Sequence, residues 1–126
     1  MADISPLIPE GRQVIQAYGG GGFRISGVDH CGSVIVFPTR TVSWVATMLA
    51  EATEENLARV ATAGADVELL LIGAGRAPGV LAPELRKTLR GAGVVAEVMD
   101  TGAACRTFNV LMAEERRVAA ALIATP

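Results

Sequence analysis

The feature that most restricts the fold is a pair of apolar segments, residues 67–72 and 94–99, separated by a helical pattern. Segments that are apolar almost throughout are typical of strands covered on both faces of a sheet. Pro83 suits the first turn of the helix between them. The apolar stripe of that helix consists of Leu85, Thr88, Leu89 and Ala92, and its polar face of Arg86, Lys87 and Arg90. A unit of this kind predicts two parallel strands joined by a right-handed crossover.

Two more helices and a last strand extend the pattern. Thr53 is a predicted N-cap for a helix at residues 54–63. A helix at residues 103–113 is expected to bury Ala104, Phe108 and Leu111, and the chain then returns as a strand at residues 117–124. Because the hinge before this strand is short, we expect the strand to run antiparallel to its neighbours. The alternation of helix and strand predicts an α/β fold with three layers and a mixed sheet.

The first third of the chain predicts an N-terminal β-meander. Two strands, at residues 14–18 and 23–26, flank a run of glycines at residues 19–22. Glycine reaches positive φ without strain, so this run suits a hairpin loop. The following elements are a turn at residues 29–32 and strands at residues 33–37 and 41–45. Phe37 and Trp44 of the last two strands are expected in the core, because large aromatic residues are mostly buried. The alternative is that they form part of an exposed apolar surface for a partner.

Length and composition narrow the class of protein. A chain of 126 residues fits one domain, residues 1–126, with a substantial core. The formal net charge of -2 provides no basic field for nucleic acid. The first ten residues contain Asp3, Pro6, Pro9 and Glu10, which excludes an apolar signal-peptide core there. No apolar run approaches the ~20 residues of a membrane helix. We therefore expect a cytoplasmic protein that does not insert into membranes.

The cysteines and glycines match no cofactor or metal motif. Cys31 and Cys105 lie far apart and form no Cys-x-x-Cys pair, so we expect free thiols and neither a disulfide nor a zinc site. His30 lies between Asp29 and Cys31, but three adjacent residues rarely converge on one ion. Pro78 stands where a dinucleotide-binding motif would carry its third glycine. No cofactor is expected.

Four segments together resemble the small Mth-type domain family. They are Gly73-Ala74-Gly75 and residues 97–101, 104–111 and 114–122. The family includes mitochondrial complex I assembly factor 3 and the adipogenesis-associated Mth-type domain protein. Residues 23–27 and 32–38 and Trp44 fit the same pattern, so the resemblance covers nearly the whole chain.

The resemblance implies a three-layer fold around a mixed five-stranded sheet with one strand opposed to the others. It implies no reaction, because the family has no established set of catalytic residues. This chain departs from the pattern at two positions. Ala74 stands where a threonine is frequent, which removes a hydroxyl from that loop, and Glu115 stands where glycine often precedes the arginine. We expect the second change to alter the backbone shape of the turn.

A candidate ligand-binding cleft lies where two predicted parallel strands end. Ligands of open α/β sheets favour the crevice beyond the carboxyl ends of the strands, and a helix N-terminus there offers amide donors to an anion. The candidate residues are Gly73, Gly75, Arg76, Thr101, Cys105, Arg106 and Asn109. The structural alternative is that Asp100 or Thr101 only caps the helix and that the glycines shape a tight turn.

Two residues of this region have a reactive and a structural interpretation. Cys105 lies near a helix N-terminus beside Arg106, a setting that activates thiols, but a free cysteine is more often a small packing residue. Glu97 interrupts an apolar strand. A buried carboxylate needs a partner, so we expect a structural ion pair with Arg106, Arg116 or Arg117 rather than a general acid–base role.

No complete catalytic constellation is visible in the sequence, and we therefore assign no catalytic residue. The leading hypothesis is a non-enzymatic interaction or assembly factor that binds a protein partner and has a cleft at the sheet edge. The alternative is an enzyme or sensor that binds a small anionic ligand at Gly73, Gly75 and residues 101–109. A homo-oligomer stays open, because edge strands of small domains often pair.

Overall fold

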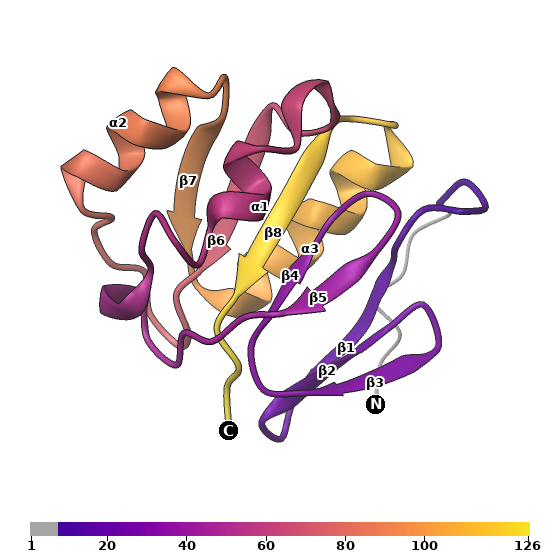
Figure 1. Ribbon diagram of the computed structural model, residues 1–126. Helices are drawn as coiled ribbons and strands as arrows, with labels where there is room; N and C mark the ends of the chain where they lie inside the picture. Colours follow the sequence, from indigo (N-terminus) through magenta and orange to yellow (C-terminus); the bar gives the residue numbers. More distant parts are fainter. Residues whose placement is uncertain (1–7) are drawn as a thin grey trace.

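A computed structural model describes residues 8–126 of the chain (Figure 1). Its central element is a five-stranded sheet with the strand order β5-β4-β8-β6-β7. The strands are β4 (Val34–Val36), β5 (Thr41–Ser43), β6 (Leu69–Gly73), β7 (Val95–Met99) and β8 (Val118–Leu122). Asp3 and Pro6, two of the residues that led us to expect no signal peptide, lie outside the described part of the chain.

The sheet is mixed, and one strand opposes the other four, as predicted. Strand β4 runs antiparallel to both β5 and β8, whereas β6 is parallel to β7 and to β8. The opposed strand is therefore β4, and the expectation that β8 would run against all its neighbours was wrong. The reason is α3 (Thr101–Ala113), which at ~1.5 Å per residue is long enough to carry the chain back across the sheet. Strand β8 therefore begins at the same end as β6 and β7.

The N-terminal β-meander is a separate antiparallel sheet of β1 (Ile15–Gly19), β2 (Gly22–Ile25) and β3 (Val28–Cys31). The hairpin at the glycine run is confirmed. The turn predicted at residues 29–32 was wrong, because residues 29–31 pair with β2. The chain turns earlier, at Ser26 and Gly27, which both have positive φ (47° and 82°). Positive φ at both central residues is the geometry of a tight two-residue hairpin.

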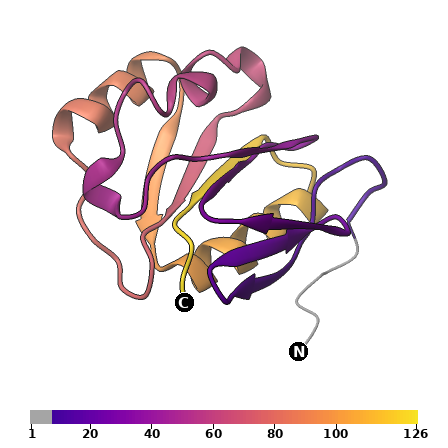
Figure 2. The same ribbon diagram turned by 60° about the horizontal axis from the view of Figure 1, so that its bottom comes forward.

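The five-stranded sheet is the middle one of three layers, as Figure 2 shows from below. One face packs against α1 (Ala58–Ala61) and α2 (Pro83–Gly91), with Leu57, Val60, Leu85 and Leu89 in that part of the core. Two short 3-10 helices, η1 (Leu49–Glu51) and η2 (Gly64–Asp66), lie in the connection between β5 and β6, before and after α1. The other face packs against α3 and the meander. The predicted three-layer α/β fold with an N-terminal meander is therefore confirmed.

Most predicted helices and core residues are confirmed, with three corrections of detail. The helix predicted at residues 54–63 is regular only at α1, although the Thr53 hydroxyl does accept a hydrogen bond from the Asn56 N–H (3.1 Å). Thr88 and Ala92 are exposed rather than part of the buried stripe, and the Arg86 guanidinium bonds the Ala96 carbonyl of β7 instead of facing only water (2.5 Å). Phe37 and Trp44 are buried, as expected.

Glu97 is exposed, so the expectation of a buried ion pair at this residue was wrong. Strand β7 lies at an edge of the sheet, and alternate residues of an edge strand reach solvent where no helix covers them. Both arginines at the start of β8 instead pair with Glu68: Arg116 at 3.4 Å, and Arg117 as a second ion pair. The ion pairs that hold the beginning of β8 thus lie beside β6, its direct neighbour.

Helix α3 ends in a Schellman turn. The Glu115 N–H donates to the Met112 carbonyl and the Arg116 N–H to the Leu111 carbonyl, both at 2.9 Å. In this turn the residue after the C-cap adopts the left-handed conformation that glycine favours. Glu115 has a φ of 58°. The turn thus keeps a glycine-like backbone despite the glutamate, contrary to our expectation of an altered shape.

Replacing Glu115 by glycine is expected to raise the free energy of unfolding by about 0.5–1 kcal/mol, because glycine adopts left-handed φ without a steric penalty. The midpoint of urea denaturation measures the change. Glu114→Gly is the matched control, since Glu114 has a φ of -88° and gains nothing from glycine. Equal losses of stability in both variants would contradict the assignment of strain to Glu115.

Candidate functional site

The seven predicted site residues lie in two segments: the end of β6 with the loop that follows it, and α3, which begins at the same edge of the sheet and extends away from it. Gly73 is the last residue of β6, and Gly75 and Arg76 follow it directly. The other four are on α3: Thr101, Cys105, Arg106 and Asn109. The carboxyl ends of neighbouring parallel strands meet at the same edge of a sheet, which brings these segments together.

Thr101 uses its backbone and its side chain to join three segments at this edge. Its N–H donates to the Gly75 carbonyl (2.8 Å), and its hydroxyl accepts from the Gly75 N–H (2.9 Å). The same hydroxyl donates to the Ile123 carbonyl just after β8 (2.8 Å). The residue is fully buried. Thr101 thus ties the loop after β6 and the end of β8 to the start of α3.

Gly73 allows this close approach. A methyl group attached to its Cα would lie 2.9 Å from the Thr101 Cα and 3.0 Å from the Leu122 Cδ2. Backbone atoms cannot move aside at such a distance without shifting the helix. The Gly73 carbonyl also accepts a hydrogen bond from the Ile123 N–H (2.8 Å). The glycine is therefore required for packing β6 against the first residue of α3.

Asp100 is the N-cap of α3, which confirms the capping interpretation. Its carboxylate accepts a hydrogen bond from the Ala103 N–H (2.8 Å), and its carbonyl accepts from the Ala104 N–H. The Gly75 and Thr101 N–H groups donate to each other's oxygen atoms. Together with the N–H groups of Ala103 and Ala104, four amides at this edge therefore have acceptors within the protein. An anion at this edge would have to compete with these bonds.

Asn109 connects α3 to the meander. Its side-chain oxygen accepts from the Ile15 N–H (2.9 Å), and its side-chain nitrogen donates to the Ile15 carbonyl (2.8 Å). The amide therefore bonds Ile15 as the backbone of a neighbouring strand would. With 1% of its surface exposed, Asn109 lies below the surface rather than in a cleft wall.

Cys105 is a packing residue. Its side chain is fully buried in a cluster with Ile15, Phe108 and other apolar residues. Burial raises the pKa of the Cys105 thiol to about 12, and the nearby Arg106 guanidinium opposes this only in part. Near neutral pH the thiol is therefore protonated, and a thiol is a far weaker nucleophile than a thiolate.

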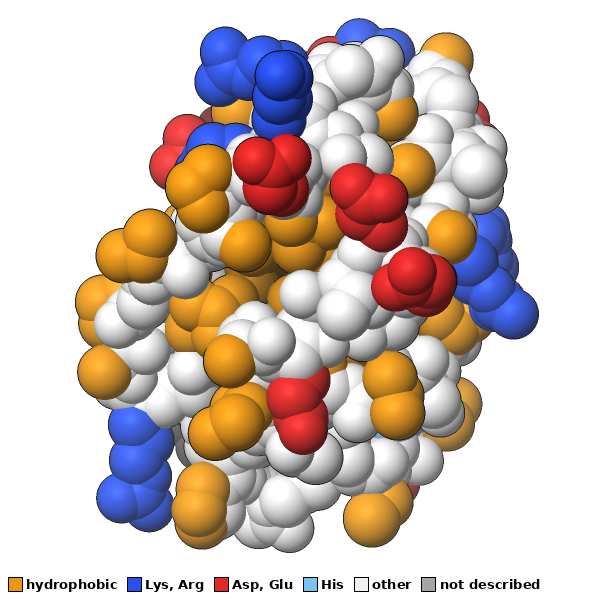
Figure 3. Space-filling model, turned by 60° about the vertical axis from the view of Figure 1, so that its left-hand side comes forward, with side chains coloured by type: hydrophobic (Ala, Val, Ile, Leu, Met, Phe, Trp, Pro, Cys, Tyr) orange, Lys and Arg blue, Asp and Glu red, His pale blue; other side chains and the backbone are white. Residues whose placement is uncertain are grey.

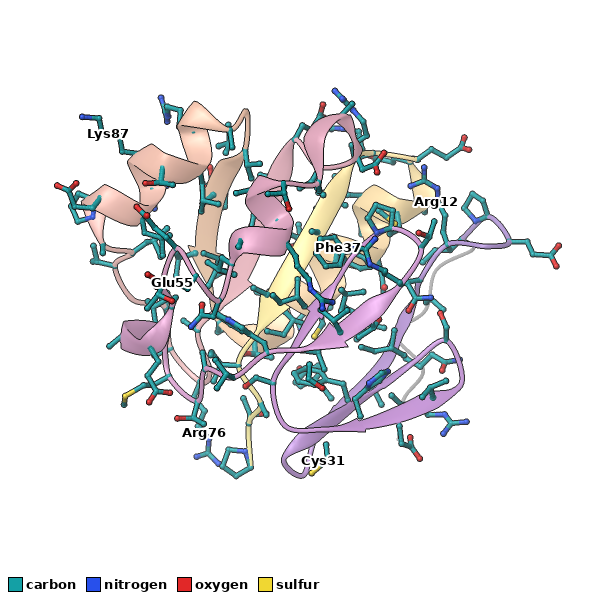
Figure 4. The ribbon with its side chains drawn as sticks, in the orientation of Figure 1. Arg12, Cys31, Phe37, Glu55, Arg76 and Lys87 are labelled. Atoms are coloured by element: carbon teal, nitrogen blue, oxygen red, sulfur yellow. The ribbon has the colours of Figure 1, made fainter. Side chains whose placement is uncertain are left out.

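Arg76 and Arg106 are the two exposed members of the set. Figure 4 shows the Arg76 side chain pointing outward near the C-terminal end. The Arg106 guanidinium donates to the Tyr18 hydroxyl of β1 (3.3 Å). That hydroxyl lies close to Gly102: a methyl group attached to the Gly102 Cα would be 2.5 Å from the Tyr18 hydroxyl oxygen. Tyr18 therefore belongs to the surface beside the N-terminus of α3.

Three surface hollows lie elsewhere in the described part of the chain. One of about 580 Å³ lies on the meander and is lined by residues 17–24 and 29–31. Another, of about 370 Å³, lies beside Trp44 and α1, and a third, of about 400 Å³, lies beside Phe37 and Arg117. None of the seven predicted site residues lines any of these three hollows. Tyr18, which contacts Arg106, lines the first of them.

Three further features concern metal ligands, membrane-spanning helices and the two cysteines. Within residues 8–126, no group of three His, Cys, Asp or Glu side chains is arranged to hold a metal ion. In the same residues, no helix has both the length and the apolar character needed to cross a membrane. Cys31 and Cys105 are both free thiols, the first exposed and the second buried.

Comparison with known proteins assigns this fold to a family. Residues 15–123 match the family described as "Protein of unknown function (DUF498/DUF598)", and the chain belongs to that family. A solved protein of Bartonella henselae, described as an outer membrane protein, has 42% identity and a TM-score of 0.86 over 95% of this chain and 100% of that one. A Bordetella pertussis structure described as a Mth938-like domain has 31% identity and a TM-score of 0.79. It aligns with 93% of this chain and 89% of its own.

Among the relatives with a named role is NADH dehydrogenase [ubiquinone] 1 alpha subcomplex assembly factor 3 of Xenopus tropicalis. It is 36% identical over 86% of this chain. The match spans 60% of the frog protein, so the chain corresponds to about three fifths of its length. The resemblance to the Mth-type domain family is thereby confirmed.

Tyr18 is a residue at this edge that the sequence analysis missed. It is separated from Arg106 by most of the chain, and a tyrosine at the end of a strand is equally typical of a solvated position. A visible signal was Gly102, since a glycine in the first turn of a helix indicates a close neighbour. The sequence does not say which residue that neighbour is.

Thr101→Val is expected to lower the free energy of unfolding by about 2–3 kcal/mol, because it leaves the half-buried Gly75 N–H and the buried Ile123 carbonyl without their partner. Chemical denaturation measures it. Thr107→Val is the control: Thr107 is half-buried, and no hydrogen bond of its side chain is found within residues 8–126. If Thr101 served a ligand instead of the fold, both variants of the ligand-free protein would be equally stable.

Cys105 is expected to resist iodoacetamide in the folded protein, whereas the exposed Cys31 reacts; both react in urea. Intact mass spectrometry counts the adducts. The raised pKa also sets a pH dependence. Between the ordinary value of 9.0 and about 12, the unfolded chain releases the thiol proton and the folded chain keeps it. The contribution of this thiol to stability therefore falls as pH rises above about 9. Alkylation of Cys105 at the rate of Cys31 would contradict this.

Proposed function

We propose that this chain is an assembly factor, a non-enzymatic protein that binds a protein partner while a respiratory NADH dehydrogenase is put together. The observation that carries the proposal is the 36% identity, over 86% of the chain, to a relative named as an assembly factor of that enzyme. The relatedness extends through the meander, the sheet and α3, because the family match covers residues 15–123.

The use of polar and reactive side chains supports a binding role. The side chains of Thr101 and Asn109 form hydrogen bonds that join α3 to β1 and to the segments that follow β6 and β8. The Cys105 thiol is buried and protonated. These groups therefore shape a rigid body on which surface residues are displayed. A rigid body with a specific surface is what recognition of another protein needs.

The site, the partner and the location of the protein belong to this proposal. Because the chain corresponds to 60% of the frog relative, the partner is an inference from the shared part alone. We place the protein in the cytoplasm, where the exposed Cys31 would stay reduced. A small anion at the candidate edge is the alternative proposal. It would bind through Arg76 and Arg106, since these are the exposed side chains of the seven.

Deleting the gene in its source organism tests the assembly role. We expect membranes to lose most of their NADH:quinone oxidoreductase activity and native gels to show incomplete subassemblies, because the partner subunit is left unsupported. Expression of the intact chain from a plasmid should restore both. Succinate:quinone oxidoreductase activity of the same membranes is the control and should not change.

An unchanged amount of assembled NADH dehydrogenase in the deletion strain would contradict the proposal. Equal losses of both oxidoreductase activities would contradict it too, because they would indicate a general defect of the membrane. An assembly defect restored by the intact chain, but not by Arg106→Gln, would favour the anion-binding edge as the functional part of the molecule.

A further inference from the structure

The face over α2 and η1 carries apolar side chains that no part of the described chain covers. Val80 is 89% exposed and Met48 is 57% exposed. They belong to two loops that touch, since a methyl group on the Gly79 Cα would lie 2.8 Å from the Leu49 Cδ2. Figure 3 shows this face as an apolar hollow between α2 and η1. We name the surface formed by Met48, Leu49 and Val80 the apolar loop surface.

The apolar loop surface is continuous with the core. Leu49 and Ala52 are partly buried and pack against the cluster that contains Leu57, Leu81 and Leu85. Residues on such a support are held in place, so the exposed side chains next to them form a firm surface. Large apolar side chains gathered on a rigid surface mark sites of protein interaction more often than scattered ones do.

Carboxylates surround this surface. Glu51, Glu54 and Glu55 follow Met48 along the chain, and residues 41–58 contain no lysine or arginine. Glu84 lies in the first turn of α2, and the Thr88 hydroxyl of α2 donates to the Glu54 carboxylate (2.5 Å). Figure 3 shows acidic side chains around the apolar hollow and basic ones further out.

These carboxylates form no ion pair within residues 8–126. The ion pairs of residues 8–126 join Arg24 to Asp29 and Glu68 to Arg116 and Arg117, and none includes the four glutamates. Hydrogen bonds from the Thr47 backbone and side chain hold the pKa of Glu51 below its ordinary value, so this carboxylate is charged at neutral pH. The rim is therefore acidic, and an apolar occupant bound here meets four carboxylates that form no ion pair among the described residues.

We infer that the apolar loop surface binds a basic amphipathic segment of a partner protein, with the segment's apolar side chains on Met48, Leu49 and Val80 and its Lys or Arg side chains beside the glutamates. This inference rests on the proposed function and names the surface and the chemistry of its partner. Complementary charge steers such a partner to the surface and selects against acidic ones, while the apolar contact supplies the burial that holds it.

Fluorescence anisotropy tests this with a short labelled amphipathic peptide that has leucines on one helix face and lysines and arginines on the other. A matched peptide carries glutamate in place of every basic residue. We expect the basic peptide to bind the intact chain, more weakly as salt is added, and the acidic peptide not to bind. The double variant M48S/V80S and the triple variant E54Q/E55Q/E84Q should each bind about tenfold more weakly.

Matched controls carry the same changes elsewhere on the surface. V28S/V110S removes two exposed valines, and E97Q/E114Q/E115Q removes three exposed carboxylates. Both should bind the basic peptide as the intact chain does. Because every substituted side chain is exposed, melting temperatures should stay near that of the intact chain, which separates loss of binding from loss of folding.

Several results would overturn the inference. They are equal affinity for the two peptides, no affinity for the basic one, or equal weakening by the control variants. Self-association that M48S/V80S abolishes would assign the surface to a second copy, and binding to phosphatidylcholine vesicles abolished by the same variant would assign it to lipid. In the deletion strain, full rescue by M48S/V80S would contradict the inference and leave the assembly role standing. A deletion strain that assembles NADH dehydrogenase normally would contradict the assembly role whatever the peptides do.

Discussion

The arrangement of this molecule depends on the contact between Thr101 and the ends of two central strands. One buried hydroxyl donates to the Ile123 carbonyl and accepts from the Gly75 N–H, so it satisfies groups that follow β8 and β6. Gly73 gives the helix room to come this close. Once the first residue of α3 is set in this way, its buried face, including Cys105 and Phe108, lies directly on the sheet. Buried polar groups that lose such partners are costly, so the contact is both specific and hard to replace.

Asn109 extends the same helix toward the N-terminal meander. Two hydrogen bonds to the Ile15 backbone connect elements that are far apart in the sequence, and the apolar residues Phe23 and Ile25 then close the layer. Helix α3 is thus the element through which both sheets are joined. The exposed surface that we assign to a partner lies on the opposite layer, over α2 and η1, where the side chains of Met48 and Val80 are exposed.

Much of the fold could be predicted from local patterns, and the failures have physical causes. The apolar segments that became β6 and β7 and the helix begun by Pro83 are local signals, and they were confirmed. The direction of β8 was mispredicted because it depends on the path of α3 across the sheet, which a hinge length does not reveal. The third strand of the meander was taken for a turn because Asp29 and Gly32 favour turns, whereas Ser26 is an unusual residue at positive φ.

The contacts of the candidate residues could be predicted only in part from the sequence. Strand ends and a helix start predicted that Gly73, Gly75 and Thr101 would lie together, and they do. A threonine hydroxyl that binds a ligand and one that bonds a backbone carbonyl look the same in a sequence. The exposed state of Met48 and Val80 was equally hidden, because an apolar residue in a loop is as typical of a core satellite as of a binding surface.

The position of β8 has a consequence for how the chain reaches its structure. This strand comes after all the others in chain order, yet it lies in the middle of the sheet, between β4 and β6, which do not pair with each other. The β4–β5 hairpin and the β6–α2–β7 unit can form locally, but no strand pairing joins them before β8 is present. Pairings between segments so distant in sequence are slow to form. Until then the place of one strand is open between the two halves of the sheet, and the edges of β4 and β6 that β8 pairs with have no strand partner.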